Sequence, residues 1–544
     1  MNKKIKMIVV GVAMLSGIAA ITVTNDKLFE ISKNLEIFIS VYRELNTNFV
    51  DELDPGTMMR TAIDAMTNSL DPYTNFVSES QIESYWINDD EKYQGIGARV
   101  ALIGDKLKVL EPYEGGPAFT VGIKAGDEIT SISGINISGK KLDEINAILR
   151  GLPGTDINLG VVRNGSTIVE TKTLTRGEVN IPNVPYSGFV TDDVGYISLT
   201  TFSSNASLNI AKAFRELKDK NPNMSGIILD LRQNGGGFLH EAVAICNLFI
   251  PQGEIVVTTK GKIKERDQAF KTLGPPLDLE IPLTILIDKR SASASEIVSG
   301  VIQDLDRGVL IGQRSFGKGL VQNTKDLPYN ARLKLTTSKY YIPSGRCIQG
   351  VEYENGEPKD IPDAMRSKFK TRSGRVVLDG GGVSPDIKTT SKTLLPITQS
   401  LIDQYMIFEF ANQYCKGIDS IESVGIFQFK DFNSFTDFLK KNNFKYVSDA
   451  EKHLTSAKVA LENHGSKDMM EEVVKLQNKL NANKSNELQV AKEQIIDEIE
   501  KEIVTRYYFQ KGKVQQKLSD DPEVQEAVQL MRQTDKYKKV LSVK

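Results

Sequence analysis

The segment LTILIDKRSASASEIVSGVIQDL (residues 283–305) joins a short apolar run to an amphipathic one. The run at 283–288 is typical of a strand that is buried on both faces. The apolar residues that follow it recur on one face of a helix: Ile297, Val298, Val301, Ile302 and Leu305. A second strand-like run, GIILDL (226–231), also precedes a helical pattern. Strands that alternate with helices indicate an α/β core, which we expect over residues 177–393.

Three serines alternate at the start of the predicted helix, Ser291, Ser293 and Ser295. Ser293 and Glu296 fit an S-x-x-E capping box, in which the serine only satisfies backbone amides. The same position also suits a nucleophile, because a helix N-terminus stabilises negative charge. A serine nucleophile usually needs a histidine base, and the chain contains only three histidines: His240, His453 and His464. The residues alone therefore leave both roles open.

The other strand end carries three consecutive glycines, in ILDLRQNGGGF (228–238). Glycines between a strand and a helix allow backbone N–H groups to converge on a negative charge. That charge could belong to a phosphate or to a transient oxyanion. The spacing of a P-loop is absent from this stretch.

Composition limits the class of protein. A chain of 544 residues is too long for one core and should form three or four domains. The formal net charge of −2 gives no reason to expect nucleic acid as a partner. The chain contains only three cysteines, and they are widely spaced, so they predict neither a disulfide framework nor a metal site.

The N-terminus has the layout of a secretory signal. Lys3, Lys4 and Lys6 precede an apolar run from Met7 to Val23. The run is at the short limit of what spans a bilayer, so an uncleaved anchor is the alternative, and it would hold the protein at a membrane. We expect residues 1–25 to direct export, either to the periplasm or to the inner membrane with the rest of the chain facing the periplasm.

Amphipathic patterns predict helices at both ends of the exported part. FEISKNLEIFISVYREL (29–45) places apolar residues three or four apart, and we expect an N-terminal helical region over 26–92. Residues 394–544 are mostly amphipathic and charged, and we expect an accessory helical domain there.

Residues 93–176 resemble a PDZ domain. Short β-rich runs are broken by Gly, Asn and Asp, one helix is expected at 142–151, and AGDEITSISG (125–134) is close to that family's typical run. In PDZ domains a Gly-rich loop binds the terminal carboxylate of a peptide, which then adds a strand to the sheet edge. By this resemblance the substrate-binding residues are Gln94, Gly95, Ile96 and Gly97, and Arg150 links ligand binding to the core.

The stretch SASASEIVSGVIQDLDRGVLIGQRSFGKGLVQ (291–322) is similar to the catalytic segment of the carboxyl-terminal processing, or tail-specific, proteases. Further matches follow in the family's order: NSLDPYTNF (68–76), LRQNGGGF (231–238), TTSKYYIPSGRCIQ (336–349) and GGVSPDI (381–387). The resemblance covers roughly residues 35–390. It implies a multidomain α/β + β protein with an N-terminal helical region, a PDZ domain, an α/β Ser–Lys protease core and a C-terminal helical domain.

The resemblance also assigns roles. Ser293 is the nucleophile and Lys318 its base, which removes the need for histidine. Gln322 is expected to orient Lys318, and the oxyanion hole to combine the N–H of Ala294 with that of Gly236 or Gly237. The family commonly has proline where this chain has Gly235, and this difference leaves open which glycine N–H points inward. No metal or cofactor is implied.

The predicted function is an exported serine endopeptidase that cuts proteins near their C-termini after PDZ capture of the free C-terminus. Its partners are protein or peptide substrates. The alternatives are a catalytically inactive PDZ scaffold and an apolar-ligand-binding protein on the same fold. The sequence leaves open whether the protein forms a homo-oligomer.

Overall fold

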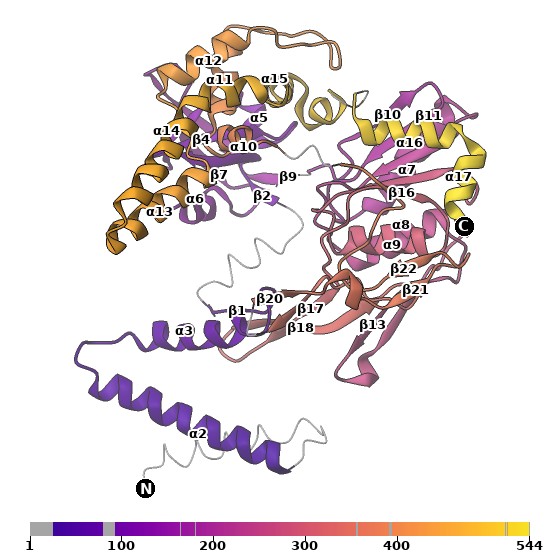
Figure 1. Ribbon diagram of the computed structural model, residues 1–544, viewed down its shortest axis with the longest axis horizontal. Coiled ribbons are helices and arrows are strands. Elements are labelled where there is room, and N and C mark those ends of the chain that lie inside the picture. Colours follow the sequence, from indigo (N-terminus) through magenta and orange to yellow (C-terminus); the bar gives the residue numbers. More distant parts are fainter. Residues whose placement is uncertain are drawn as a thin grey trace. The chain divides into compact units, whose positions relative to one another are not determined.

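The computed structural model describes residues 25–79, 93–163, 165–179, 181–354, 357–390, 394–516, 518 and 520–542 (Figure 1). Residues 1–24, with nearly all of the predicted signal or anchor, lie outside this set. The chain divides into two compact units, residues 1–72 and 73–544.

The first unit contains helices α2 (Asn25–Asn48) and α3 (Pro55–Asn68), which confirms the predicted N-terminal helices. The helical region was expected to continue to residue 92, but Asn75–Val77 form a strand, β1. Asp54 caps α3 by accepting a hydrogen bond from the Gly56 N–H at 2.8 Å, and Pro55 suits the first turn because it has no N–H to satisfy. None of the helices within the described ranges is both long and apolar enough to cross a membrane.

The predicted PDZ unit is a sheet with strand order β3-β4-β5-β7-β8, and β6 pairs with β5. Apolar side chains of this sheet and of two helices form its core. A short pair of strands, β2 (Tyr93–Gly95) and β9 (Gly177–Val179), joins the two ends of the unit. The other elements are β3 (Ala98–Ile103), β4 (Lys106–Pro112), α5 (Pro117–Thr120), β5 (Glu128–Ile132), β6 (Ile135–Asn136), α6 (Leu142–Leu149), β7 (Asp156–Val162) and β8 (Val169–Thr175).

The predicted α/β core has a six-stranded sheet with order β10-β11-β12-β15-β16-β23. All neighbours are parallel except β10 and β11. β12 and β15 pair directly, so the glycine run and the serine segment follow adjacent carboxyl ends. The strands are β10 (Tyr186–Thr191), β11 (Val194–Ser198), β12 (Gly226–Asp230), β15 (Leu283–Ile287), β16 (Val309–Gly312) and β23 (Ile387–Lys388).

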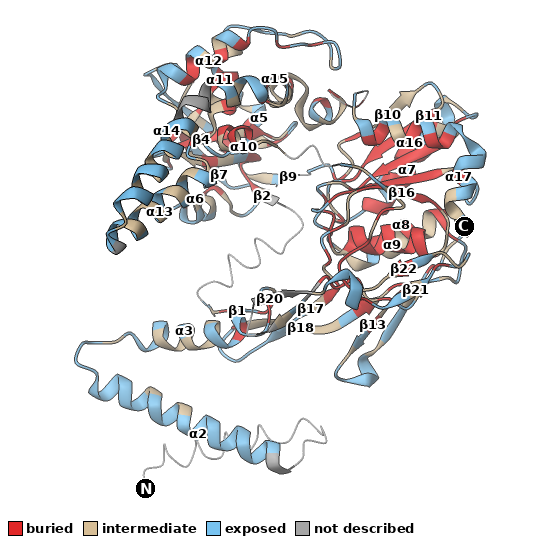
Figure 2. Cartoon of the chain, in the orientation of Figure 1, coloured by how far each residue is buried: buried red, intermediate tan, exposed pale blue. Residues whose placement is uncertain are grey.

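Helices cover both faces of this sheet. Ile227 and Leu229 pack among residues of α7 (Ala206–Lys220), α8 (Leu239–Phe249) and α9 (Ala294–Asp304). The alternate residue, Ile228, faces the opposite side, where α16 (Pro522–Arg532) and α17 (Thr534–Leu541) contribute Val524, Val528 and Tyr537. Figure 2 shows the central strands of the sheet and helix α9 as buried, and α8 as partly buried. The two last helices, predicted as part of the accessory domain, therefore form a layer of the core.

A second sheet lies in the same unit, with order β1-β18-β13-β14 and β17 paired to β18. β1 precedes the PDZ unit in the chain and β10 follows it, so the PDZ unit is an insertion into the core. The strands are β1 (Asn75–Val77), β13 (Ile255–Gly261), β14 (Gln268–Lys271), β17 (Leu320–Asp326) and β18 (Arg332–Tyr341). Two hairpins accompany them: β19 (Val351–Glu354) with β20 (Glu357–Asp360), and β21 (Lys368–Lys370) with β22 (Val376–Leu378).

Residues 394–516 fold mainly into helices around an aromatic cluster. The Phe410 ring lies 5.0 Å from that of Phe435 and 5.4 Å from that of Phe429, edge to face in both cases. The helices are α10 (Pro396–Asp403), α11 (Met406–Tyr414), α12 (Phe432–Lys441), α13 (Asp449–His464), α14 (Lys467–Val490) and α15 (Lys492–Gln515).

Candidate active site

Ser293 lies at the turn between β15 and α9, with φ 57° and ψ −114°. A non-glycine residue with positive φ costs conformational energy, and such strain persists where the surrounding structure imposes it. A strained strand-to-helix turn also presents the nucleophile of the α/β-hydrolases. Ser293 is half-buried, whereas Ser291 and Ser295 are fully buried.

The hydroxyls of the two neighbouring serines are both used in structural hydrogen bonds. Ser291 donates to the Leu231 carbonyl at 2.8 Å and accepts from the Asp288 N–H at 2.9 Å. Ser295 lies within α9 and donates to the Asn234 carbonyl at 2.9 Å. Both serines thus fasten the serine segment to the strand end that holds the glycine run.

Glu296 is completely buried beneath the predicted dyad. Its Oε2 accepts the backbone N–H of Ser293 at 2.8 Å and that of Lys318 at 2.9 Å. Its Oε1 accepts from the Gly317 N–H at 2.7 Å and the Ser315 hydroxyl at 2.6 Å. Burial raises the pKa of Glu296 to about 7, although these donors oppose the rise. The sequence indicated Glu296 only as a capping residue; the structure adds its contacts with the lysine segment.

Tyr340 joins the same two residues from the other side. Its hydroxyl donates to the Lys318 carbonyl and lies 3.2 Å from the Ser293 carbonyl oxygen. The side chain is buried, and burial raises the pKa of its phenol well above the ordinary value. Ser293 and Lys318 are therefore held at their N–H groups by one side chain and at their carbonyls by another.

Lys318 is half-buried, and its Nζ lies 4.6 Å from the centroid of the Tyr73 ring. Such a contact between an ammonium and a ring face is attractive. Gly317 has φ +93°, and a Cβ on it would be 2.8 Å from the Gly350 Cα. Only glycine permits this turn, which directs the lysine onto the protein rather than into an exposed loop.

Gln322 was expected to orient Lys318, and its described hydrogen bond is with another residue. Its amide donates to the Thr336 hydroxyl at 3.1 Å, and among the described residues no contact joins it to Lys318. A register shift between Val321 and Gln322 marks an irregularity in β17 at this point. Its predicted role stays a prediction without a supporting contact.

The glycine run packs directly against Ser293. A Cβ on Gly236 would be 2.8 Å from the Ser293 Cβ and 3.0 Å from the Ala294 nitrogen. The Gly236 N–H already donates to the Asn234 Oδ1 at 2.9 Å. The N–H groups of Gly237 and Ala294 have no hydrogen-bond acceptor within the described part of the chain. Of the three predicted donors to an oxyanion, these two are available.

The first two residues of the predicted peptide-binding loop belong to a strand, and the last two follow it. Gln94 and Gly95 belong to β2, where they pair with Glu178 and Gly177. Beyond them Gly97 has φ +72°, and a Cβ there would be 2.7 Å from the Pro117 Cδ. The N–H groups of Ile96 and Gly97 have no acceptor in the residues that the structure describes.

The strand after this loop, β3, is at the edge of its sheet and could accept an added strand. Arg150 ends the neighbouring helix α6, with its N–H bonded to the Asn146 carbonyl at 3.0 Å.

Two other polar residues near the site have structural contacts. The His240 ring is exposed and stacks on Phe238 with centroids 5.0 Å apart. Asp304, at the end of α9, forms a fully buried ion pair with Arg346 at 2.8 Å. Within the described ranges no group of three or more His, Cys, Asp or Glu side chains could hold a metal ion.

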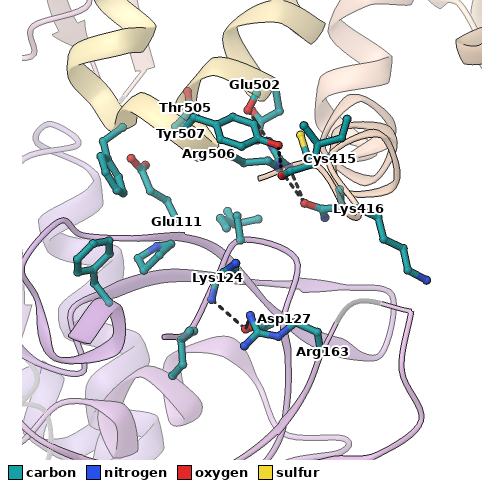
Figure 3. A pocket seen from close by; sticks show the side chains of 18 of the residues that line it. Glu111, Lys124, Asp127, Arg163, Cys415, Lys416, Glu502, Thr505, Arg506 and Tyr507 are labelled. Carbon is teal, nitrogen blue, oxygen red and sulfur yellow. Dashed lines mark hydrogen bonds and ion pairs between the residues drawn. The ribbon is translucent and has the colours of Figure 1, made fainter. Parts of the chain in front are cut away.

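A cavity of about 500 Å³ lies away from this site, between the PDZ unit and the helical domain (Figure 3). Glu111 and Arg163 line it from one side, and Arg506 and Tyr507 from the other. Neither Ser293 nor Lys318 borders it, so it is separate from the predicted chemistry.

Three protein-family models match the chain: peptidase family S41 at 193–355, PDZ domain at 94–173, and the C-terminal helical domain of probable PDZ-proteases at 397–531. A carboxy-terminal-processing protease of Bartonella bacilliformis is 33% identical over 355 residues, which cover 64% of this chain and 81% of that relative. A probable CtpA-like serine protease of Staphylococcus aureus is 31% identical over 450 residues, covering 79% and 85%. The solved photosystem II D1 C-terminal processing protease is 24% identical, covers 69% of this chain and 95% of its own, and gives a TM-score of 0.37. The chain therefore belongs to peptidase family S41, as a serine peptidase with a PDZ domain and with carboxy-terminal-processing proteases as its relatives.

Proposed function

We propose that this protein is an exported endopeptidase that cleaves proteins close to their C-termini, with Ser293 as nucleophile and Lys318 as base. The observation that supports this assignment best is the common support of the two residues. They lie in different loops, yet Glu296 bonds both of their N–H groups and Tyr340 contacts both of their carbonyls.

In the proposed reaction the neutral Nζ of Lys318 takes the Ser293 hydroxyl proton while Oγ forms a bond to the scissile carbonyl carbon. The carbonyl π electrons move to oxygen, and the N–H groups of Ala294 and Gly237 donate to this oxyanion. Collapse of the intermediate breaks the C–N bond, and the leaving amine takes its proton from the Lys318 ammonium. Water then cleaves the acyl-enzyme by the same steps, with Lys318 again as base.

We assign the second oxyanion donor to Gly237 rather than Gly236. The Gly236 N–H is already bonded within its own loop, and redirecting it would break that hydrogen bond. The Gly237 N–H has no competing acceptor among the described residues.

We propose further that the loop at 94–97 binds the free carboxylate of a substrate and that the substrate's tail pairs with β3. The match to the PDZ domain model, the edge position of β3 and the two unbonded N–H groups support this assignment. Amidation of a substrate's C-terminus removes the charge that the loop would bind. We therefore expect an amidated peptide to be cleaved with a higher KM than its acid form and a similar kcat. Equal KM values would refute PDZ capture but leave the peptidase assignment intact.

Export is proposed on the basis of Lys3, Lys4 and Lys6 followed by the apolar run to Val23. Fractionation of cells that produce the full chain should place it in the periplasm or in the inner membrane. N-terminal sequencing of that material would distinguish a cleaved signal from a retained anchor. Recovery of the intact chain in the cytoplasm would contradict the proposal.

The decisive test of activity compares Ser293→Ala with Ser291→Ala and Ser295→Ala on an unstructured protein substrate, with products identified by mass spectrometry. Only Ser293→Ala should abolish cleavage. The other two should retain activity at temperatures where they are folded, although Ser291→Ala loses two buried hydrogen bonds and Ser295→Ala loses one, at a cost of about 1–3 kcal/mol for each bond. An inactive scaffold or a ligand carrier would leave the substrate intact in every case.

A further inference from the structure

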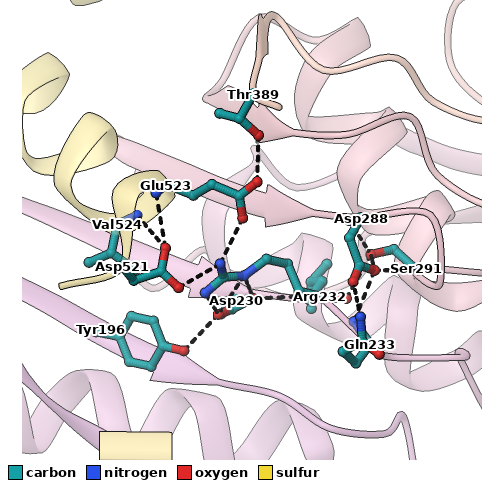
Figure 4. Close-up of polar contacts among 11 residues, drawn as sticks. Tyr196, Asp230, Arg232, Gln233, Asp288, Ser291, Thr389, Asp521, Glu523 and Val524 are labelled. Carbon is teal, nitrogen blue, oxygen red and sulfur yellow. Dashed lines mark hydrogen bonds and ion pairs between the residues drawn. The ribbon is translucent and has the colours of Figure 1, made fainter. Parts of the chain in front are cut away.

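Three carboxylates surround Arg232, which lies just before the glycine run (Figure 4). The guanidinium nitrogens are 2.6 Å from Asp230 Oδ2, 2.8 Å from Asp521 Oδ2 and 2.7 Å from Glu523 Oε2. Burial disfavours the charge, yet the pKa of Arg232 is raised above its ordinary value because Asp230 and Asp521 favour the protonated form. Arg232 is thus the cation of a partly buried, multiply bonded cluster.

Two of these carboxylates come from the start of α16, near the other end of the chain. Asp521 caps this helix by accepting the N–H groups of Glu523 at 2.9 Å and Val524 at 3.1 Å. Glu523 is buried, and its second oxygen accepts from the Thr389 hydroxyl. Both carboxylates are therefore held in place by contacts other than those with Arg232. The guanidinium binds to oxygens whose positions are already fixed.

The backbone beyond Arg232 leads directly to the active site. The Gln233 N–H donates to the Asp288 Oδ1 at 3.0 Å, and Gln233 has φ 60°, which is strained for a non-glycine residue. The next residue, Asn234, accepts the Ala292 N–H at 3.0 Å through its carbonyl. Arg232 thus directly precedes the two residues whose backbone hydrogen bonds hold the glycine run against the serine segment.

We infer that Asp521 and Glu523 are positioning residues for the peptidase reaction. They hold Arg232, and through it they hold the glycine run at the distance from Ser293 that the oxyanion requires. The catalytic site is then complete only when α16 is docked on the core sheet. This inference rests on the proposed oxyanion hole, because the glycine run acts on the reaction through that hole.

The test compares kcat and KM of the full-length protein with those of Glu523→Gln and Asp521→Asn on one peptide substrate. Each change keeps the size of the side chain and removes its charge. The matched control is Arg532→Gln, which breaks a more exposed ion pair between the same helix and Asp193 at 3.0 Å. We expect kcat to fall at least about tenfold in the two acid variants with KM within twofold, since mispositioned catalytic groups lower the rate more than substrate binding. Arg532→Gln should retain the kcat of the unmodified protein.

A second measurement separates positioning from general loosening of the fold. A peptide boronate that adds to Ser293 forms a tetrahedral adduct whose oxygen occupies the oxyanion hole. Its affinity should fall at least about tenfold in Glu523→Gln, in parallel with kcat, while thermal unfolding shows the variant to be folded at the assay temperature. An unchanged kcat in both acid variants, or an equal loss in Arg532→Gln, would overturn the inference. An unmodified protein that cleaves nothing would instead refute the proposed function.

Discussion

Ser293 and Lys318 donate their backbone N–H groups to one and the same oxygen, Oε2 of Glu296, over 2.8 and 2.9 Å. Because Tyr340 also contacts both carbonyls, neither loop can move without disturbing the other. The proposed nucleophile and base are thus held in one rigid frame. Such preorganisation lowers the barrier because little ordering is left for the reaction step.

Removal of the Tyr340 hydroxyl should loosen this frame without opening a cavity. We expect Tyr340→Phe to lower kcat about tenfold to a hundredfold while KM stays within about twofold, because the dyad is misplaced but the substrate still binds. Tyr341→Phe makes the same chemical change on the next residue and serves as the control. If steady-state kinetics show equal effects for the two variants, Tyr340 does not position the dyad.

Replacement of Lys318, the proposed base, tests the proposed dyad itself. Lys318→Arg keeps the positive charge, but a guanidinium cannot deprotonate in a protein, so this variant should show no cleavage. In the unmodified protein kcat/KM should rise with pH, because only the neutral amine accepts the serine proton. A pH–rate profile of the free enzyme provides the measurement. Full activity of Lys318→Arg would mean that another group takes the proton.

Alanine substitutions at the three consecutive glycines should have different effects on stability and activity. A Cβ on Gly235 would have no other atom within 4 Å, and this residue lies outside the left-handed region, so Gly235→Ala should be neutral or stabilise by about 0.4–1 kcal/mol. Gly236 and Gly237 have φ of +100° and +145°, and their Cβ atoms would be 2.7 Å from the Ala292 oxygen and 2.5 Å from the Phe202 oxygen. Both alanine variants should lose activity and stability. Thermal unfolding combined with a cleavage assay distinguishes the three.

The buried Glu296 should make stability depend on pH. Its pKa is raised from 4.5 to about 7, so the folded protein holds the proton more tightly than the unfolded chain. The stabilisation from this proton is fully present below pH 4.5 and is lost as pH rises towards 7; the total is about 3 kcal/mol. Denaturant unfolding should show this decline in the unmodified protein and not in Glu296→Gln, which cannot titrate. Parallel profiles for the two proteins would contradict the assignment.

Local patterns predicted the elements of the site better than the contacts among them. The strand-to-helix turn at Ser293 and the glycine run follow from apolar periodicity and from glycine placement, and both are confirmed. The bond from the Gly236 N–H to Asn234 could also have been predicted, because Asn side chains commonly accept the N–H two residues on. Gln322 could not be placed in the same way, since a local irregularity in β17 determines where its amide points.

Tertiary packing supplied what periodicity could not. The apolar stripe of α16 predicts a buried face but not its partner, so the sequence placed this helix in an accessory domain. The structure packs it on the core sheet, where Val524 and Val528 join Ile228 and Leu286. The role of Tyr340 could not be predicted either. The sequence does not indicate that the hydroxyl of a tyrosine in a strand contacts the loops of Ser293 and Lys318.

The insertion of the PDZ unit between β1 and β10 tethers it to the core by both of its ends. In the proposed mode of capture, a substrate tail bound there stays connected to the chain that carries Ser293, so cleavage becomes effectively intramolecular. Weak binding of the tail by the PDZ unit would then be sufficient for efficient cleavage. The cleaved C-terminal end would also dissociate rapidly. The separation between the loop at 94–97 and Ser293, more than the sequence around the scissile bond, would then set how far from a protein's end the cut falls.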